Sequence, residues 1–142
     1  MDGGSSGRRM RRFFDLTFLP FFVFTGAITA LGAVNAFWYK WAVEKIVLIP
    51  FNEDYTIILR HWGFMLGLIG VFMIIAAFSA AWRYPILIFC ALEKAFAVYL
   101  VAVNWNRPYA RGLWGAAAMD AAVVLYIFAF LMVRGFTKPS PR

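Results

Sequence analysis

Four long apolar stretches constrain this chain more than any other feature of its sequence. The bilayer core holds no water to bind backbone amides, so a segment that crosses it must be helical or belong to a closed barrel. A run of about 20 apolar residues is the length that a helix needs to cross this core. We therefore predict an all-α fold, an integral membrane four-helix bundle. The predicted spans are residues 13–39, 61–82, 86–105 and 112–133.

Composition places the chain in the same class. Its 142 residues are 63% hydrophobic and 15% charged, whereas soluble domains are usually about 45–50% apolar and about 25% charged. Four spans take up most of this length, so we expect no separate soluble catalytic domain. The predicted organisation is a flexible basic N-terminal tail at 1–12, a transmembrane domain at 13–133 and a basic C-terminal tail at 134–142.

Tryptophan and basic residues indicate where the spans end and how they are oriented. All six tryptophans lie at or near a predicted span end, where membrane interfaces enrich indole rings. Lysine and arginine are more frequent in the two tails and the turn after the second span than in the other two loops. This bias predicts that both termini are cytoplasmic. It also explains the formal charge of +7 without a nucleic-acid partner, which we do not expect.

Residues 40–60 form the longest connection between spans. They are apolar in places but are interrupted by charged residues, Asn52 and Pro50, so they are too broken to cross the membrane. An interfacial segment fits this pattern. It could cover an internal cavity at the mouth of the bundle, or it could be a plain amphipathic linker, and we favour the linker.

Glu93 and Lys94 lie in the middle of the third span, and Asp120 is the one acidic residue of the fourth. A charge near the bilayer centre costs several kcal/mol and usually faces the bundle interior with a partner. A rise of 1.5 Å per residue puts Lys94 and Asp120 at levels about 6 Å apart, which their side chains can bridge. We predict that they pair, with Glu93 pointing about 100° away around the helix. The pair could be structural, a proton-coupled or polar-substrate site, or a water-filled vestibule.

Two further features lie in the second span. Gly63, Gly67 and Gly70 share one helix face, which predicts close packing against another helix of this chain or of a partner. Arg60 and His61 form an interfacial polar cluster at the outer end of the span. A lone histidine at that position is more often a polar anchor than a ligand.

Catalytic and metal-binding signatures are missing from the sequence. It contains no HExxH, no GxSxG and no glycine-rich phosphate loop, and it has a single histidine. The single cysteine, Cys90, allows neither an internal disulfide nor a CxxC site. We therefore predict no catalytic residues, no metal and no cofactor, and we lean against an enzyme.

The order of several motif residues resembles that of the DoxX-like group of small four-helix bacterial membrane proteins. These residues span about 54–133 of the chain and occur as Arg60-His61-x-Gly63, Arg83-x-Pro85, Lys94 and Asp120. Glu93 is not part of that pattern. The resemblance implies a four-helix bundle in the bacterial inner membrane, with Arg60, His61, Lys94 and Asp120 as its site residues. One branch of the group is described as a small subunit of a quinone-reducing oxidoreductase, an activity that we do not carry over.

Two functional interpretations remain open. In the first, the chain is an accessory or scaffold subunit whose glycine-lined and aromatic faces bind lipid, other membrane subunits or further copies of itself. In the second, it is a small transporter or redox-linked subunit with a cavity for a proton, a quinone or a lipid-like ligand around Glu93, Lys94 and Asp120. We favour the first, because the sequence shows no inverted repeat and no pair of broken helices.

Overall fold

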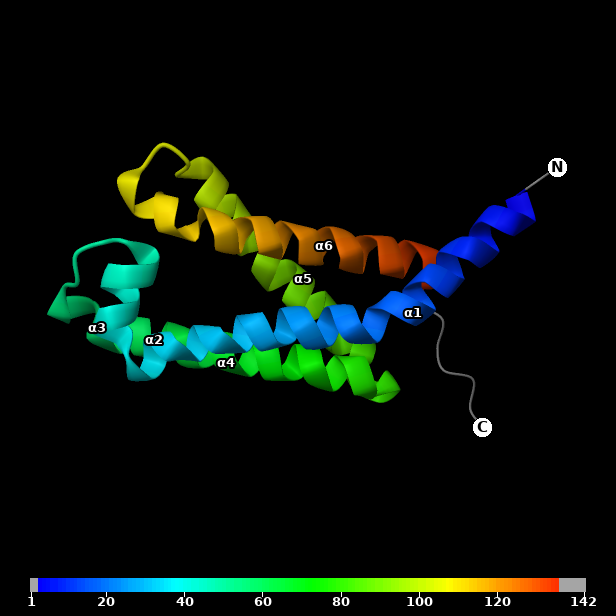
Figure 1. Ribbon diagram of the computed structural model, residues 1–142, viewed down its shortest axis with the longest axis horizontal. Helices are drawn as coiled ribbons and strands as arrows, with labels where there is room; N and C mark the ends of the chain where they lie inside the picture. Colours follow the sequence, from blue (N-terminus) through cyan, green and yellow to red (C-terminus); the bar gives the residue numbers. More distant parts are fainter. Residues whose placement is uncertain (1–2, 136–142) are drawn as a thin grey trace.

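Four long helical segments run back and forth between the two ends of the molecule (Figure 1). The computed structural model describes residues 3–135, and these residues contain no strand, so the predicted all-α class is confirmed. Each segment is long and apolar enough to cross a membrane, which makes the chain an integral membrane protein. The four segments are Gly7–Phe37, Glu53–Phe78, Ala80–Val103 and Pro108–Arg134.

The first segment begins earlier than predicted. It comprises α1 (Gly3–Ala30), one turn of 3₁₀ helix, η1 (Leu31–Ala33), and the short α2 (Val34–Phe37). Residues 3–12, which the sequence analysis predicts as part of a flexible tail, are helical and form the start of α1. Its arginines and methionine are good helix formers, and they extend α1 beyond the ends of the other helices (Figure 1). The predicted C-terminal tail lies outside the described residues from position 136.

The turn between the second and third segments also differs from the prediction. α4 (Thr56–Phe78) and α5 (Ala80–Val103) are separated by Ser79 alone, so the turn predicted at 82–85 is helical. Arg83 explains this short break. Its Nε donates to the Ala76 carbonyl at 3.1 Å and its Nη2 to the Ala77 carbonyl at 3.3 Å. These bonds satisfy carbonyls that the end of α4 leaves free, so no longer loop is needed.

The connection at 39–55 folds over one end of the bundle, which we call the cap end. The cap consists of α3 (Tyr39–Ala42), the π-helical turn η2 (Val43–Val47) and η3 (Glu53–Tyr55). It meets η4 (Pro108–Leu113), which leads into α6 (Trp114–Arg134). A Cβ atom on Gly112 would lie 2.1 Å from the Val47 carbonyl oxygen, so the two backbones are in direct contact. This contact favours a cap over a plain linker.

The glycine face of α4 packs against the first segment. A Cβ atom on Gly63 would lie 2.4 Å from the Ala36 amide nitrogen, and one on Gly70 would lie 2.3 Å from the Ala30 amide nitrogen. At Gly67 the nearest atom is the Ala33 Cβ, at 3.0 Å. Close packing through these glycines is therefore confirmed, and the helix that fills the face belongs to the same chain.

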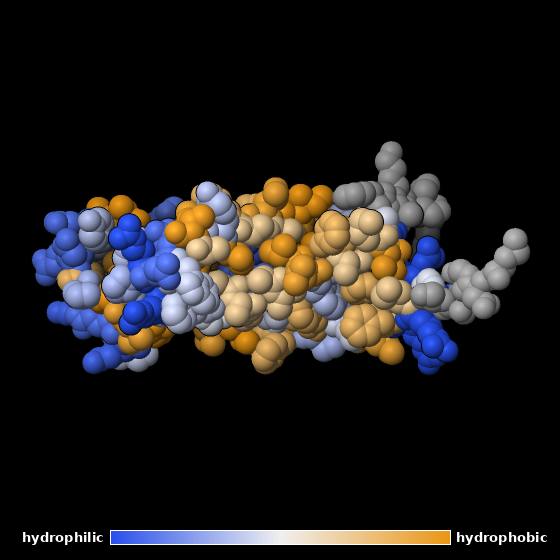
Figure 2. All heavy atoms as spheres, turned by 90° about the horizontal axis from the view of Figure 1, so that it is seen from above, coloured by the Kyte–Doolittle hydropathy of each residue, from blue (hydrophilic) through white to orange (hydrophobic). Residues whose placement is uncertain are grey.

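The half of the bundle away from the cap, which we call the termini end, has a solid aromatic core. The rings of Phe18 and Phe130 lie 4.7 Å apart, and those of Phe21 and Tyr126 stack at 4.0 Å. Asp15 of α1 forms an ion pair with Arg134 beside this core. Figure 2 shows hydrophobic residues over the middle of the molecule and hydrophilic residues toward both ends, as contact with a lipid bilayer requires.

Candidate functional site

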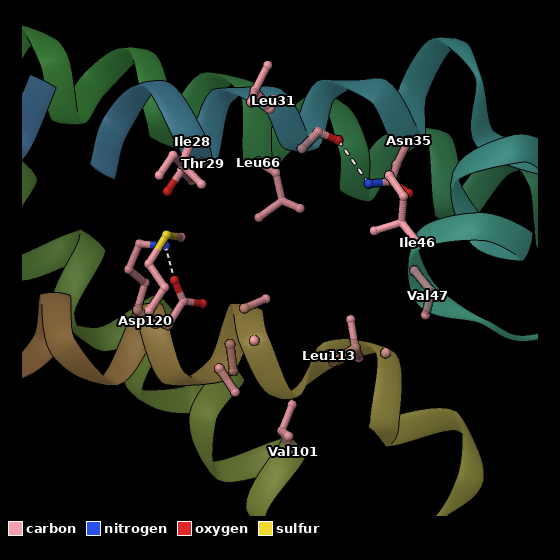
Figure 3. A pocket seen from close by; sticks show the side chains of 18 of the residues that line it. Ile28, Thr29, Leu31, Asn35, Ile46, Val47, Leu66, Val101, Leu113 and Asp120 are labelled. Carbon is pink, nitrogen blue, oxygen red and sulfur yellow. Dashed lines mark hydrogen bonds and ion pairs between the residues drawn. The ribbon is translucent and has the colours of Figure 1, made fainter. Parts of the chain in front are cut away.

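Lys94 of α5 and Asp120 of α6 form the ion pair that the sequence predicts (Figure 3). The Lys94 ammonium donates to Asp120 Oδ1, and the two side chains are 1% and 14% exposed. Lys94 lies 14 residues after the first residue of α5, about 21 Å along the helix axis. A helix that began at residue 86, as the sequence predicts for the third span, would put Lys94 only about 12 Å from its start. The pair therefore lies closer to the cap end than to the termini end.

The interface between α5 and α6 is tightly packed on one side of this pair and lines a cavity on the other. Toward the termini end, the same helix faces carry apolar residues of 0% exposure. They lie three, four or seven residues from the paired side chains and are Leu87, Cys90, Val123 and Ile127. Toward the cap end, the same faces carry Ala97, Val101, Leu113 and Ala116, which line a cavity. The ion pair thus forms the floor of that cavity, above a tightly packed core.

The cavity has a volume of about 610 Å³. Two helix pairs form its walls (Figure 3). The first segment and α4 lie on one side, and α5 and α6 lie on the other. Ile46 and Val47 of the cap contribute to its roof. Leu31, 72% exposed, and Leu100, 45% exposed, both line it, so the cavity also opens at the apolar side of the bundle. This volume falls within the range of about 300–1,000 Å³ typical of small-molecule sites.

Three polar atoms at the cavity are buried and have no hydrogen-bond partner in the described part of the chain. They are Thr29 Oγ1, Asn35 Oδ1 and Glu93 Oε2, and all three residues line the cavity. Leaving such an atom without a partner costs about 1–3 kcal/mol, so native proteins rarely do so without a ligand or a bound water nearby. Most of the remaining lining is apolar. The combination of apolar walls and a few polar groups is typical of a binding site.

Thr29 differs from the other threonines of α1. The hydroxyl of Thr17 donates to the carbonyl of Phe13 at 2.8 Å, and that of Thr25 donates to the carbonyl of Phe21 at 2.7 Å. This bond to the preceding turn is the usual arrangement for threonine inside a helix. Thr29 makes no such bond, although it is only 6% exposed. Its hydroxyl is therefore available to a molecule in the cavity.

The predicted interfacial cluster lies apart from the cavity. Arg60 Nε donates to the Ala36 carbonyl at 3.0 Å, and its guanidinium lies 5.6 Å from the centre of the Tyr39 ring. It thereby holds the end of α2 in place. His61 is exposed and is not among the residues that line the cavity. Across the described residues, no three His, Cys, Asp or Glu side chains are grouped so that they could hold a metal ion.

Sequence reasoning found Glu93, Lys94 and Asp120 but missed Thr29 and Asn35. Both missed residues are polar and lie well inside a predicted span, which is the signal that could have identified them. Neither carries a charge, and a threonine in a helix usually bonds to its own backbone, so the signal was weak.

No protein-family model, no curated protein and no solved structure matches this chain. The resemblance to the DoxX-like group therefore stays a prediction that depends on the motif residues. The same holds for a bacterial inner-membrane location and for cytoplasmic termini.

Proposed function

We propose that this chain is an integral membrane protein that binds a lipid-soluble small molecule in the cavity between its two helix pairs. The observation that carries the proposal is the hollow of about 610 Å³ above the Lys94–Asp120 pair, with buried polar atoms that lack partners. An ion pair that only fixed the register of α5 and α6 would need no such hollow.

This proposal follows the second interpretation of the sequence rather than the first. The accessory role drew on a glycine-lined face that could bind other membrane helices. Within this chain, α1 and α2 already occupy that face at Gly63, Gly67 and Gly70. The packed aromatic core separates the cavity from the termini end, so the site suits binding from the cap half or from the lipid rather than passage through a pore.

Different cavity residues would contact the apolar and the polar parts of a ligand. Leu66, Ala97 and Val101 offer apolar contact to the body of a ligand. Lys94 has three ammonium protons and Asp120 has a second carboxylate oxygen, so the pair can still bind a polar group after bonding to each other. A ligand that is mostly apolar with a small polar head matches this arrangement.

Filling the cavity tests the proposal. Gly115 of α6 lines the cavity, and a Cβ atom there would meet nothing within 4 Å, so Gly115→Leu should fold while occupying the space. Ala118→Leu is the matched control, because Ala118 is exposed on the same helix and does not line the cavity. Each protein is purified from membranes in mild detergent, extracted with organic solvent and analysed by mass spectrometry.

We expect one lipid-soluble compound at near-equimolar amounts in the wild type and in Ala118→Leu, and its loss in Gly115→Leu. Identical extracts from all three proteins, after circular dichroism has shown that all are folded, would refute binding in this cavity.

A further inference from the structure

The unpartnered atoms of the cavity share one chemical property, which is the capacity to accept hydrogen bonds. The Asn35 amide donates through Nδ2 to the Gly32 carbonyl at 3.1 Å, and a carbonyl can only accept, so the atom left over is Oδ1. Oδ1 can only accept. Glu93 Oε2 also accepts when the carboxyl is ionised, and Thr29 Oγ1 can accept or donate. A ligand that satisfies all three must bring N–H or O–H donors.

The formal charge of the cavity also favours a ligand that donates hydrogen bonds. Its charged lining residues are Glu93, Lys94 and Asp120, which give two carboxylates and one ammonium. Asp120 neutralises the charge of the ammonium, while Glu93 Oε2 has no hydrogen-bond partner among the described residues. A buried carboxylate oxygen in apolar surroundings is stabilised most effectively by a positively charged donor.

We infer that the ligand is a lipophilic amine, an apolar molecule whose protonated amino group donates to Glu93 at the floor of the cavity. This inference rests on the proposed function and specifies its ligand. The apolar body lies between Leu66 and Val101, and it enters through the apolar side of the bundle rather than from water. Fatty acids and other anionic amphiphiles are disfavoured, because their carboxylate would face Glu93 and could not donate to Asn35 Oδ1.

A set of probes with one chain length separates these chemistries. Decylamine, decanol and decanoate carry the same ten-carbon body with a positive, a neutral and a negative head at pH 7. Binding of each probe to the full chain is measured by isothermal titration in phosphatidylcholine nanodiscs, and the heat of binding to empty nanodiscs is subtracted. The proteins are the wild type, Glu93→Gln, the cavity-filled Gly115→Leu and Glu53→Gln. Glu53 is exposed and does not line the cavity, so Glu53→Gln controls for loss of a carboxylate.

We expect decylamine to bind the wild type about tenfold or more tightly than decanoate, the equivalent of one charge-assisted hydrogen bond. Glu93→Gln should lose about tenfold in affinity for decylamine with little change for decanol, while Glu53→Gln behaves like the wild type. A repeat in nanodiscs that contain phosphatidylethanolamine identifies the natural source of the amine. If decylamine binds more weakly there, the lipid head group competes for the site and is the natural ligand. If its binding is unchanged, the natural ligand is a free amine.

Two results would overturn the inference in different ways. The inference that the ligand is an amine would be refuted if decanoate bound as tightly as decylamine, or if Glu93→Gln and Glu53→Gln bound decylamine with equal affinity. Either result would still leave the cavity as a binding site. If none of the three probes binds the wild type more tightly than Gly115→Leu, the proposed function fails as well.

Discussion

Breaking the Lys94–Asp120 pair should be among the most destabilising single changes in this chain. Asp120→Leu would leave the Lys94 ammonium, 1% exposed, without the carboxylate that it donates to. Removing one partner of a buried ion pair typically costs about 3–5 kcal/mol, because the remaining charge stays in a medium of low polarity. Total stabilities are commonly about 5–15 kcal/mol, so this change removes a large share.

The double variant Lys94→Met with Asp120→Leu separates the cost of the orphaned charge from the value of the pair. Methionine and leucine fill similar space without charge, so the double variant should regain most of the loss, with a coupling free energy of about 2 kcal/mol or more. Asp15→Leu is the matched control. Its ion pair with Arg134 is 58% and 34% exposed, so its loss should cost about 0–1 kcal/mol.

Reversible unfolding in mixed detergent micelles, followed by tryptophan fluorescence, measures these free energies. The reasoning would be refuted if Asp120→Leu cost no more than Asp15→Leu, or if the double variant lost the sum of the two single losses. Either result would mean that the floor of the cavity is solvated and that the pair is not held in an apolar environment.

Three further predictions concern packing, the cap and topology. Gly70→Ala should destabilise the protein by about 1–3 kcal/mol, because a Cβ atom there would lie 2.3 Å from the nearest backbone atom. Gly67→Ala should destabilise it less, because a Cβ atom there would lie 3.0 Å from a side chain. The reverse order of stabilities in chemical unfolding would contradict this packing. Gly112→Ala should speed hydrogen exchange across residues 43–50, because its Cβ would displace the cap, and unchanged exchange would argue against the contact. Cysteines at Ser5 and Ser140 should react with a maleimide from the same side of the membrane, while the buried native cysteine stays unlabelled; labelling from opposite sides would rule out four spans.

Hydropathy and spacing were enough to predict the membrane class, the four spans and the partner of Lys94. The pairing was predictable because Asp120 is the one acidic residue of its span, so depth along the helices left a single choice. The glycine face was predictable for a similar reason, since the spacing of small residues alone decides which face allows close approach.

The helix break at Ser79 and the extension of α1 could not be predicted in the same way. Ser79 is flanked by neither glycine nor proline, and the break depends on Arg83 reaching back to the carbonyls of α4. Pro85 gave a misleading signal, because it lies in the second turn of α5 and does not interrupt the helix. At Ser79 this helix-end contact decided the outcome rather than local preference, whereas α1 extends because the basic residues before the first span also favour a helix.

The cavity was the least predictable feature. Its existence depends on how far the two helix pairs separate toward the cap, which side-chain packing along α1, α4, α5 and α6 determines. The pattern of apolar residues is the same for a helix that faces a cavity as for one that faces a packed core. Only the buried polar residues Thr29, Asn35 and Glu93 could have marked the difference in advance.

An experimental structure of the full chain, purified from membranes and kept in lipid, tests the central claim most directly. We predict Lys94 and Asp120 in contact at the floor of an open cavity, with density for a small molecule within hydrogen-bond distance of Thr29, Asn35 or Glu93. Side chains that fill the space between the two helix pairs, or a Lys94 that points away from Asp120, would contradict it.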